Sequence, residues 1–128
     1  MNFHGTVLLV DDEEHIRKYV GLILRQLGAP RLIEATNGAE ALVTYQREHP
    51  DLVLLDVNMP VMNGLETLKK LRELDPACVV IMLTSLTNRQ TVEEALTLGA
   101  TNYIRKDTPK AEITKALAET IDACFELE

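Results

Sequence analysis

The sequence has no tryptophan, only two cysteines and no long apolar run. Cys78 and Cys124 lack the spacing of a metal site, and two thiols in an otherwise ordinary sequence suggest a reducing compartment. No stretch approaches the roughly 20 apolar residues that span a membrane, and residues 1–5 lack the charged and apolar regions of a signal peptide. We therefore expect a cytoplasmic protein with no membrane partner.

Basic residues are also in short supply. The 128 residues include 13 Lys and Arg against 20 Asp and Glu, which gives a formal net charge of −7. A nucleic-acid-binding face needs clustered positive charge to meet the phosphates, so this balance argues against DNA or RNA as a partner. The length and the hydrophobic content of 46% are typical of one globular domain with a sizeable core, which we expect over residues 1–128.

The sequence does contain a regular alternation of short apolar runs and longer amphipathic stretches. The apolar runs predict strands at 6–10, 32–35, 52–55, 78–83 and 102–104. Apolar residues at helical spacing follow each run, and we expect these helices to end at Gly28, before Pro50, at Asp75, at Gly99 and at about Phe125. In the fourth helix the spacing predicts that Val92, Ala95 and Leu96 face inward. Strict alternation implies a parallel sheet with helices on both faces. The expected fold is an α/β domain with a five-stranded, doubly wound sheet.

Polar residues mark the points where the predicted strands end. Asp11 and Asp12 follow the first strand, Asp56 the third, Thr84 the fourth and Lys106 the fifth. The carboxyl ends of parallel strands lie on one edge of the sheet, and in the order 2-1-3-4-5 the first and third strands are neighbours at the topological switch point. Three carboxylates would then share one small pocket.

Such a pocket has a definite chemistry. Crowded carboxylates raise one another's pKa unless a cation neutralises them. An all-oxygen site suits a hard divalent ion, and Mg²⁺ in particular keeps waters and accepts phosphate oxygens. With Lys106 as a fixed positive charge and Thr84 as a hydroxyl donor, the pocket would suit a phosphoryl group during transfer.

Each residue taken alone has a plainer interpretation. Asp11 and Asp12 could be an acidic pair at a helix N-terminus, and Asp56 could be a turn residue. Thr84 could cap the following helix, and an isolated lysine such as Lys106 is usually solvated on the surface. Their shared position at one edge of the predicted sheet favours the functional interpretation.

Four segments together resemble a bacterial two-component response-regulator receiver domain of the single-domain, chemotaxis-regulator type. They are residues 10–13 (VDDE), 56–64 (DVNMPVMNG), 83–85 (LTS) and 103–106 (YIRK). The Asp-x-x-Met-Pro-x-Met-x-Gly run is the most specific of them, and the resemblance covers essentially the whole chain. It implies a flavodoxin-like (βα)5 fold with strand order 2-1-3-4-5.

The resemblance also implies roles for individual residues. Asp56 would accept a phosphoryl group from the phosphohistidine of a histidine kinase or a histidine phosphotransfer protein. Mg²⁺ would be bound by Asp12, Asp56 and the backbone carbonyl of Asn58, with Asp11 acting mainly through a water. Lys106 would pair with Asp56 or with its phosphate. The protein would be no enzyme on a separate substrate, although it would catalyse its own phosphotransfer and dephosphorylation.

The family's switch has counterparts as well. Thr84 would donate a hydrogen bond to the phosphoryl group, and Tyr103 resembles the aromatic residue that turns inward as the hydroxyl moves. The usual output is a face formed by the fourth helix, fifth strand and fifth helix, which would bind a downstream protein. Because the last helix is expected to reach about Phe125, we expect no further output domain, so signalling would proceed by protein contact or phosphorelay.

Two positions depart from the family pattern. Asp107 follows Lys106 where a proline joined by a cis bond is usual. A cis bond before a non-proline residue costs about 2.5–4 kcal/mol, so we expect a trans path, on which Lys106 could shift and Asp107 could compete for its charge. Leu86 lies at the family's entrance for attacking water and cannot orient it, so we expect slow self-dephosphorylation, with Asn58 the only nearby polar helper.

Two other functions share parts of this pattern. A phosphatase of the haloacid-dehalogenase type also uses a strand-end aspartate with Mg²⁺, but it needs a second aspartate two residues later, where this chain has Asn58. A receiver fold that binds partners without phosphorylation is the other alternative. The intact set of strand-end residues argues against it, while Asp107 keeps it open.

Overall fold

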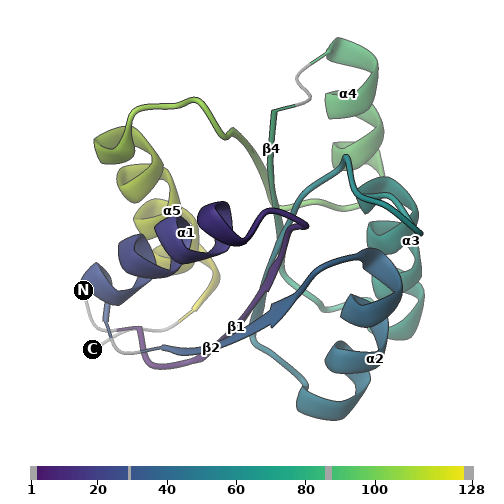
Figure 1. The fold of residues 1–128 in the computed structure, drawn as a ribbon, viewed down its shortest axis with the longest axis horizontal. Coiled ribbons are helices and arrows are strands. Elements are labelled where there is room, and N and C mark those ends of the chain that lie inside the picture. The colour runs from purple at the N-terminus through teal and green to yellow at the C-terminus, as the bar shows by residue number, and fades with distance from the viewer. Residues whose placement is uncertain (1–2, 29, 86–87, 126–128) are drawn as a thin grey trace.

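The computed structural model describes residues 3–28, 30–85 and 88–125 (Figure 1). Strands and helices alternate throughout as β1 (Thr6–Val10), α1 (Glu14–Gln26), β2 (Arg31–Ala35), α2 (Gly38–Glu48), β3 (Leu52–Leu55), α3 (Gly64–Leu74), β4 (Val80–Thr84), α4 (Arg89–Thr97), β5 (Asn102–Arg105) and α5 (Lys110–Cys124). The strands form a parallel sheet in the order β2-β1-β3-β4-β5. The predicted fold class and strand order are confirmed.

The sheet lies between two layers of helices. Helices α1 and α5 cover one face, and α2, α3 and α4 cover the other (Figure 1). Side chains alternate along a strand, so Leu8 and Val10 join the apolar cluster under α2–α4, while Val7 and Leu9 join the one under α1 and α5. All four residues of β3 (Leu52–Leu55) are buried, as expected of a central parallel strand.

Asparagine is the N-cap residue of three helices. Asn37, Asn63 and Asn88 each accept a hydrogen bond from the backbone N–H three residues later, at the starts of α2, α3 and α4. Asn88, and not Thr84, is the N-cap of α4, and Thr84 is the last residue of β4. Helix α1 starts only at Glu14, so the two aspartates after β1 precede the helix.

Some details differ from the predictions. Strand β4 begins at Val80 instead of residue 78, because the backbone N–H of Cys78 donates to the Asp75 carbonyl in a turn that precedes the strand. Leu96 was expected to face inward but is 49% exposed, and Ala95 is the one buried residue of α4. Helix α4 is therefore held by little apolar burial. Among the described residues no helix is long and apolar enough to cross a membrane.

The segment after β5 takes the expected trans path. The described residues contain no cis peptide bond. The backbone N–H of Lys106 donates to the Thr84 carbonyl at 3.0 Å, which continues the pairing of β5 with β4. Asp107 forms an ion pair with Arg105 at 2.8 Å. The expectation that Asp107 competes for Lys106 is thus wrong, because the carboxylate of Asp107 pairs with Arg105 instead. Leu86 lies outside the described residues.

The loop between β3 and α3 requires a glycine at its end. The N–H of Gly64 donates to the Val57 carbonyl at 2.7 Å, which folds the loop back against the end of β3. A Cβ atom at Gly64 would overlap the backbone carbonyl oxygen of Asp56 and lie 2.7 Å from the Val57 Cα. Met59 is buried and anchors the same loop in the core. The glycine of the Asp-x-x-Met-Pro-x-Met-x-Gly run is therefore what lets α3 start this close to Asp56.

A Gly64→Ala substitution should destabilise the protein by about 1–3 kcal/mol, because the added methyl group must displace backbone. Urea unfolding measures this change. Gly21→Ala in α1 is the matched control, since a Cβ there meets the ends of the Leu32 and Leu9 side chains, at 3.3 and 4.0 Å, and no backbone atom, and alanine is the better helix former. Equal effects of the two substitutions would contradict this explanation of the loop.

A side-chain hydrogen bond joins α2 to the end of α3. The Tyr45 hydroxyl donates to Asp75 Oδ2 at 2.7 Å. Burial, and then this bond, raises the pKa of Tyr45, while the bond lowers the pKa of Asp75. We expect Tyr45→Phe to lower the free energy of unfolding by about 1 kcal/mol at neutral pH.

Because the pKa of Asp75 is lowered in the folded state, the stability that the bond contributes is present at neutral pH and declines as the pH falls through that lowered pKa. A double-mutant cycle with Asp75→Asn checks the assignment. Urea unfolding would be measured at neutral pH and again at a pH below the lowered pKa of Asp75. Strictly additive effects at neutral pH would show that the two side chains do not interact.

Candidate functional site

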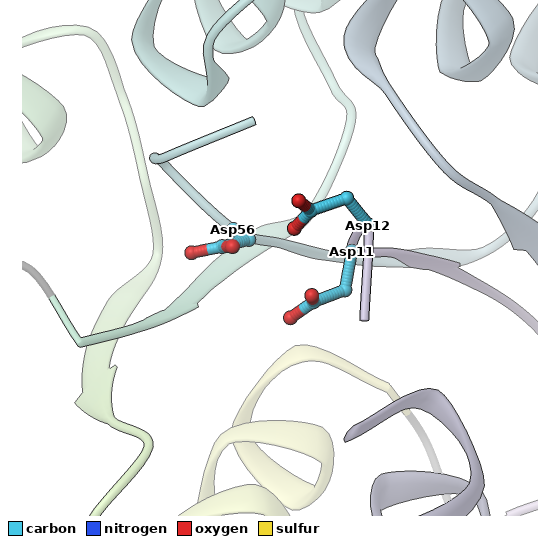
Figure 2. Close-up of side chains that lie close together, drawn as sticks. All are labelled: Asp11, Asp12 and Asp56. Atoms are coloured by element: carbon cyan, nitrogen blue, oxygen red, sulfur yellow. The ribbon is translucent and has the colours of Figure 1, made fainter. Parts of the chain in front are cut away.

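Three carboxylates meet at the carboxyl edge of the sheet. Asp11 and Asp12 follow β1, and Asp56 follows the neighbouring strand β3. One oxygen from each lies within 4.8 Å of the others, and Figure 2 shows the three side chains close together. Asp11 and Asp56 are buried, at 5% and 3% exposed, whereas Asp12 is exposed. The pocket thus has a buried floor and one carboxylate at its mouth.

The backbone fixes the two buried carboxylates. The N–H of Asp11 donates to the Ala35 carbonyl at 3.1 Å, and that of Asp56 to the Val10 carbonyl at 3.0 Å, so each residue extends the strand pairing by one position. Oδ1 of Asp11 accepts the Glu13 N–H at 2.9 Å. Oδ1 of Asp56 likewise accepts the next residue's N–H, at 2.8 Å. One oxygen of each carboxylate is therefore held by backbone, and the other remains for the pocket.

Lys106 reaches these remaining oxygens from the end of β5. Its Nζ lies 2.7 Å from Asp11 Oδ2, 3.0 Å from Asp56 Oδ2 and 3.3 Å from Glu13 Oε1. Burial by itself would lower the pKa of Lys106, but the hydrogen bonds to Asp11 and Asp56 outweigh it and raise the pKa above its ordinary value. The lysine is therefore charged throughout the neutral range.

One ammonium group does not fully offset the negative charge of the pocket. Burial raises the pKa of Asp11, and the charge of Asp56 adds to this, although hydrogen bonds from Lys106 and the Glu13 N–H act in the opposite direction. The net result is a raised pKa, which means that the charged form of Asp11 is less favourable in the pocket than in water. A further cation in the pocket would relieve this strain, and oxygen-only ligands suit Mg²⁺.

The other predicted residues lie around this pocket. Thr84 is fully buried at the end of β4, next to the start of the Lys106 segment. Tyr103 is half-buried on β5 and packs against the apolar cluster on the α2–α4 face. Burial, and then the negative charge of Asp56, raises the pKa of Tyr103. Asn58 is exposed in the loop after Asp56.

Two side chains at the site were not singled out from the sequence. Glu13 was included in the segment 10–13 but was given no role of its own, yet its carboxylate contacts Lys106. Arg17 on α1 donates to the Asp11 carbonyl at 2.7 Å and to Glu34 Oε1 at 2.9 Å, so it holds the end of β1 against β2. The position of Glu13 directly after the aspartate pair was an available signal. The position of Arg17 one helical turn later gave none.

Sequence comparison finds relatives over most of the chain. The response regulator receiver domain family matches residues 7–118. The chemotaxis protein CheY of Halobacterium salinarum is 35% identical over 117 residues, which cover 91% of this chain and 97% of that protein. CheY of Bacillus subtilis is 32% identical over 116 residues, with coverage of 91% and 97%.

Solved structures give the same result. The CheX–CheY–BeF3–Mg complex of Borrelia burgdorferi matches with a TM-score of 0.86 and 29% identity, covering 95% of this chain and 90% of that one. A CheY-like receiver domain protein of Methanospirillum hungatei matches with a TM-score of 0.86 and 28% identity, covering 95% and 97%. With the sequence motifs, the strand order and these relatives in agreement, the chain belongs to the response regulator receiver domain family.

Proposed function

We propose that this receiver domain accepts a phosphoryl group on Asp56 from the phosphohistidine of a histidine kinase or a histidine phosphotransfer protein. The observation that carries the proposal is the position of Lys106, whose ammonium group lies 3.0 Å from Asp56 Oδ2 and 2.7 Å from Asp11 Oδ2. A buried carboxylate with a fixed cation beside it can act as a nucleophile toward phosphorus and tolerate the charge that develops.

The donor set fits Mg²⁺. Asp12, Asp56 and the backbone carbonyl of Asn58 would hold the ion, and Asp11 would act through a water. When bound there, Mg²⁺ supplies positive charge that offsets the negative phosphoryl oxygens. The convergence of three carboxylates and the raised pKa of Asp11 support this assignment. The magnesium named in the structure of the Borrelia burgdorferi relative supports it too.

Asp56, Lys106 and Thr84 would each have a separate role in the transfer. A carboxylate oxygen of Asp56 forms a bond to phosphorus while the bond from phosphorus to the donor's histidine nitrogen breaks, which leaves an acyl phosphate. Lys106 stays at the phosphoryl oxygens, and the Thr84 hydroxyl donates to one of them. The added charge of about −1.5 to −2, by analogy with other phosphorylated side chains, is the signal.

The readout that we propose is a shift of Thr84, Tyr103 and helix α4. Because Ala95 is the one buried residue of α4, this helix has little apolar burial to lose when it moves. A downstream protein would bind the face formed by α4, β5 and α5, or the phosphoryl group would pass to a partner's histidine. Slow self-dephosphorylation remains part of the proposal, on the strength of Leu86 in the sequence.

Incubation with acetyl phosphate and Mg²⁺ should add one phosphoryl group to the wild-type protein, as measured by intact-mass spectrometry. The adduct should be absent without Mg²⁺ and absent from Asp56→Asn. An adduct that persists in Asp56→Asn would assign the chemistry to another residue. A folded wild-type protein that stays unmodified with both acetyl phosphate and a phosphorylated histidine donor would instead favour the phosphorylation-independent binding module.

Mg²⁺ should also stabilise the unmodified protein. At ten times its dissociation constant the ion should raise the free energy of unfolding by about 1.4 kcal/mol, because it binds the folded state alone. Asp12→Asn should remove this gain in a thermal or urea unfolding measurement. Asp122→Asn, which neutralises an exposed acid on α5, should keep it. An equal response of the two variants would mean that Mg²⁺ acts on the general surface charge.

A further inference from the structure

Lys106 has as many carboxylate partners as it has protons to donate. An ammonium group carries three N–H donors. In the structure its nitrogen has three carboxylate oxygens in reach, from Asp11, Asp56 and Glu13, at 2.7, 3.0 and 3.3 Å. Until Asp56 Oδ2 itself bonds to phosphorus, a phosphoryl oxygen of the incoming donor that needs Lys106 must therefore displace one of these partners.

The three partners are not held equally. Asp11 and Asp56 are buried, and each is fixed through its second oxygen by a backbone N–H. Glu13 has the longest contact and a side chain that is 48% exposed, against 7% and 3% for the two aspartates. Its other carboxylate oxygen lies 3.5 Å from Nε2 of the exposed His15. An exposed ion pair of this kind is weak and easily replaced by water, so Glu13 is the partner that can leave.

Lys106 does not depend on Glu13 for its position. The shorter contacts to Asp11 and Asp56 remain when the Glu13 carboxylate is removed, and the backbone N–H of Lys106 is tied to the Thr84 carbonyl. Removal of the carboxylate would free one donor and would also remove a negative charge from the edge of the pocket that an anionic phosphodonor approaches. Both effects should make phosphorylation of Asp56 faster.

We propose that Glu13 is an exchangeable partner of Lys106, which occupies one ammonium donor in the unmodified protein and yields it to a phosphoryl oxygen when Asp56 is modified. Glu13 is thus a positioning residue that restrains phosphorylation. This inference rests on the proposed function, since it concerns the same reaction. No covalent step is added, because only a hydrogen bond changes partner.

The rate of adduct formation on Asp56 tests the exchange. With subsaturating acetyl phosphate and fixed Mg²⁺, Glu13→Gln should be modified roughly two- to five-fold faster than the wild type, the range that loss of one exposed ion pair allows. Glu13→Asp keeps the charge but withdraws it by one methylene group, so it should resemble Glu13→Gln if the contact matters. Glu14→Gln removes an equal charge from the next residue, which pairs with Lys18 at 3.1 Å, and should behave like the wild type.

A second measurement detects the exchange directly. Glu13→Gln should change the ¹⁵N and ¹H NMR shifts of the Lys106 ammonium group in the unmodified protein. It should leave them unchanged after treatment with fluoroberyllate and Mg²⁺, a stand-in for the phosphoryl group, because Glu13 has then already left. A merely structural role would alter both states.

The possible failures are distinguishable. If the wild type forms no Mg²⁺-dependent adduct on Asp56, the proposed function falls, and this inference falls with it. If the wild type is modified but Glu13→Gln reacts at the same rate or more slowly, only the inference is overturned. A Glu13→Asp variant that matches the wild type would reduce the role of Glu13 to a general charge effect and would likewise overturn the exchange.

Discussion

The pairing of Lys106 with two buried carboxylates is the interaction on which the rest of the site depends. Buried charges are costly unless they are paired, and Asp11 and Asp56, at 5% and 3% exposure, directly follow the neighbouring strands β1 and β3. The cation that pairs with them comes from β5, which is separated from β3 by β4. The parallel sheet in this order is therefore what brings a residue from position 106 to carboxylates at positions 11 and 56.

The site combines a rigid side with a loosely held one. Backbone hydrogen bonds fix both buried carboxylates, and the Gly64 N–H donates to the Val57 carbonyl, which holds the segment after Asp56 against the end of β3. Helix α4 follows β4 on the other side and buries a single residue, Ala95. Charge added at Asp56 would therefore act on a fixed centre and be read out where the packing is weakest, which is a sound arrangement for a switch.

Much of this could be predicted from the sequence because the signals are local. The apolar runs set the strands, and the residues directly after them set the pocket. The contacts that were missed depend on where long side chains end, which spacing does not encode. Arg105 pairs with Asp107, so Asp107 does not draw Lys106 away from the pocket. The Glu13 side chain contacts Lys106. Leu96 was assigned to the core on spacing alone, although α4 presents it to solvent.

The most direct test of the account is to locate the modified residue. Borohydride reduces an aspartyl phosphate to homoserine, which peptide mass spectrometry identifies by position. After incubation with a phosphodonor and Mg²⁺, the account predicts homoserine in place of Asp56 and nowhere else. Reduction at Asp11 or Asp12, or a phosphoryl group found on one of the three histidines, would contradict the central claim that this pocket is built to carry the phosphoryl group on Asp56.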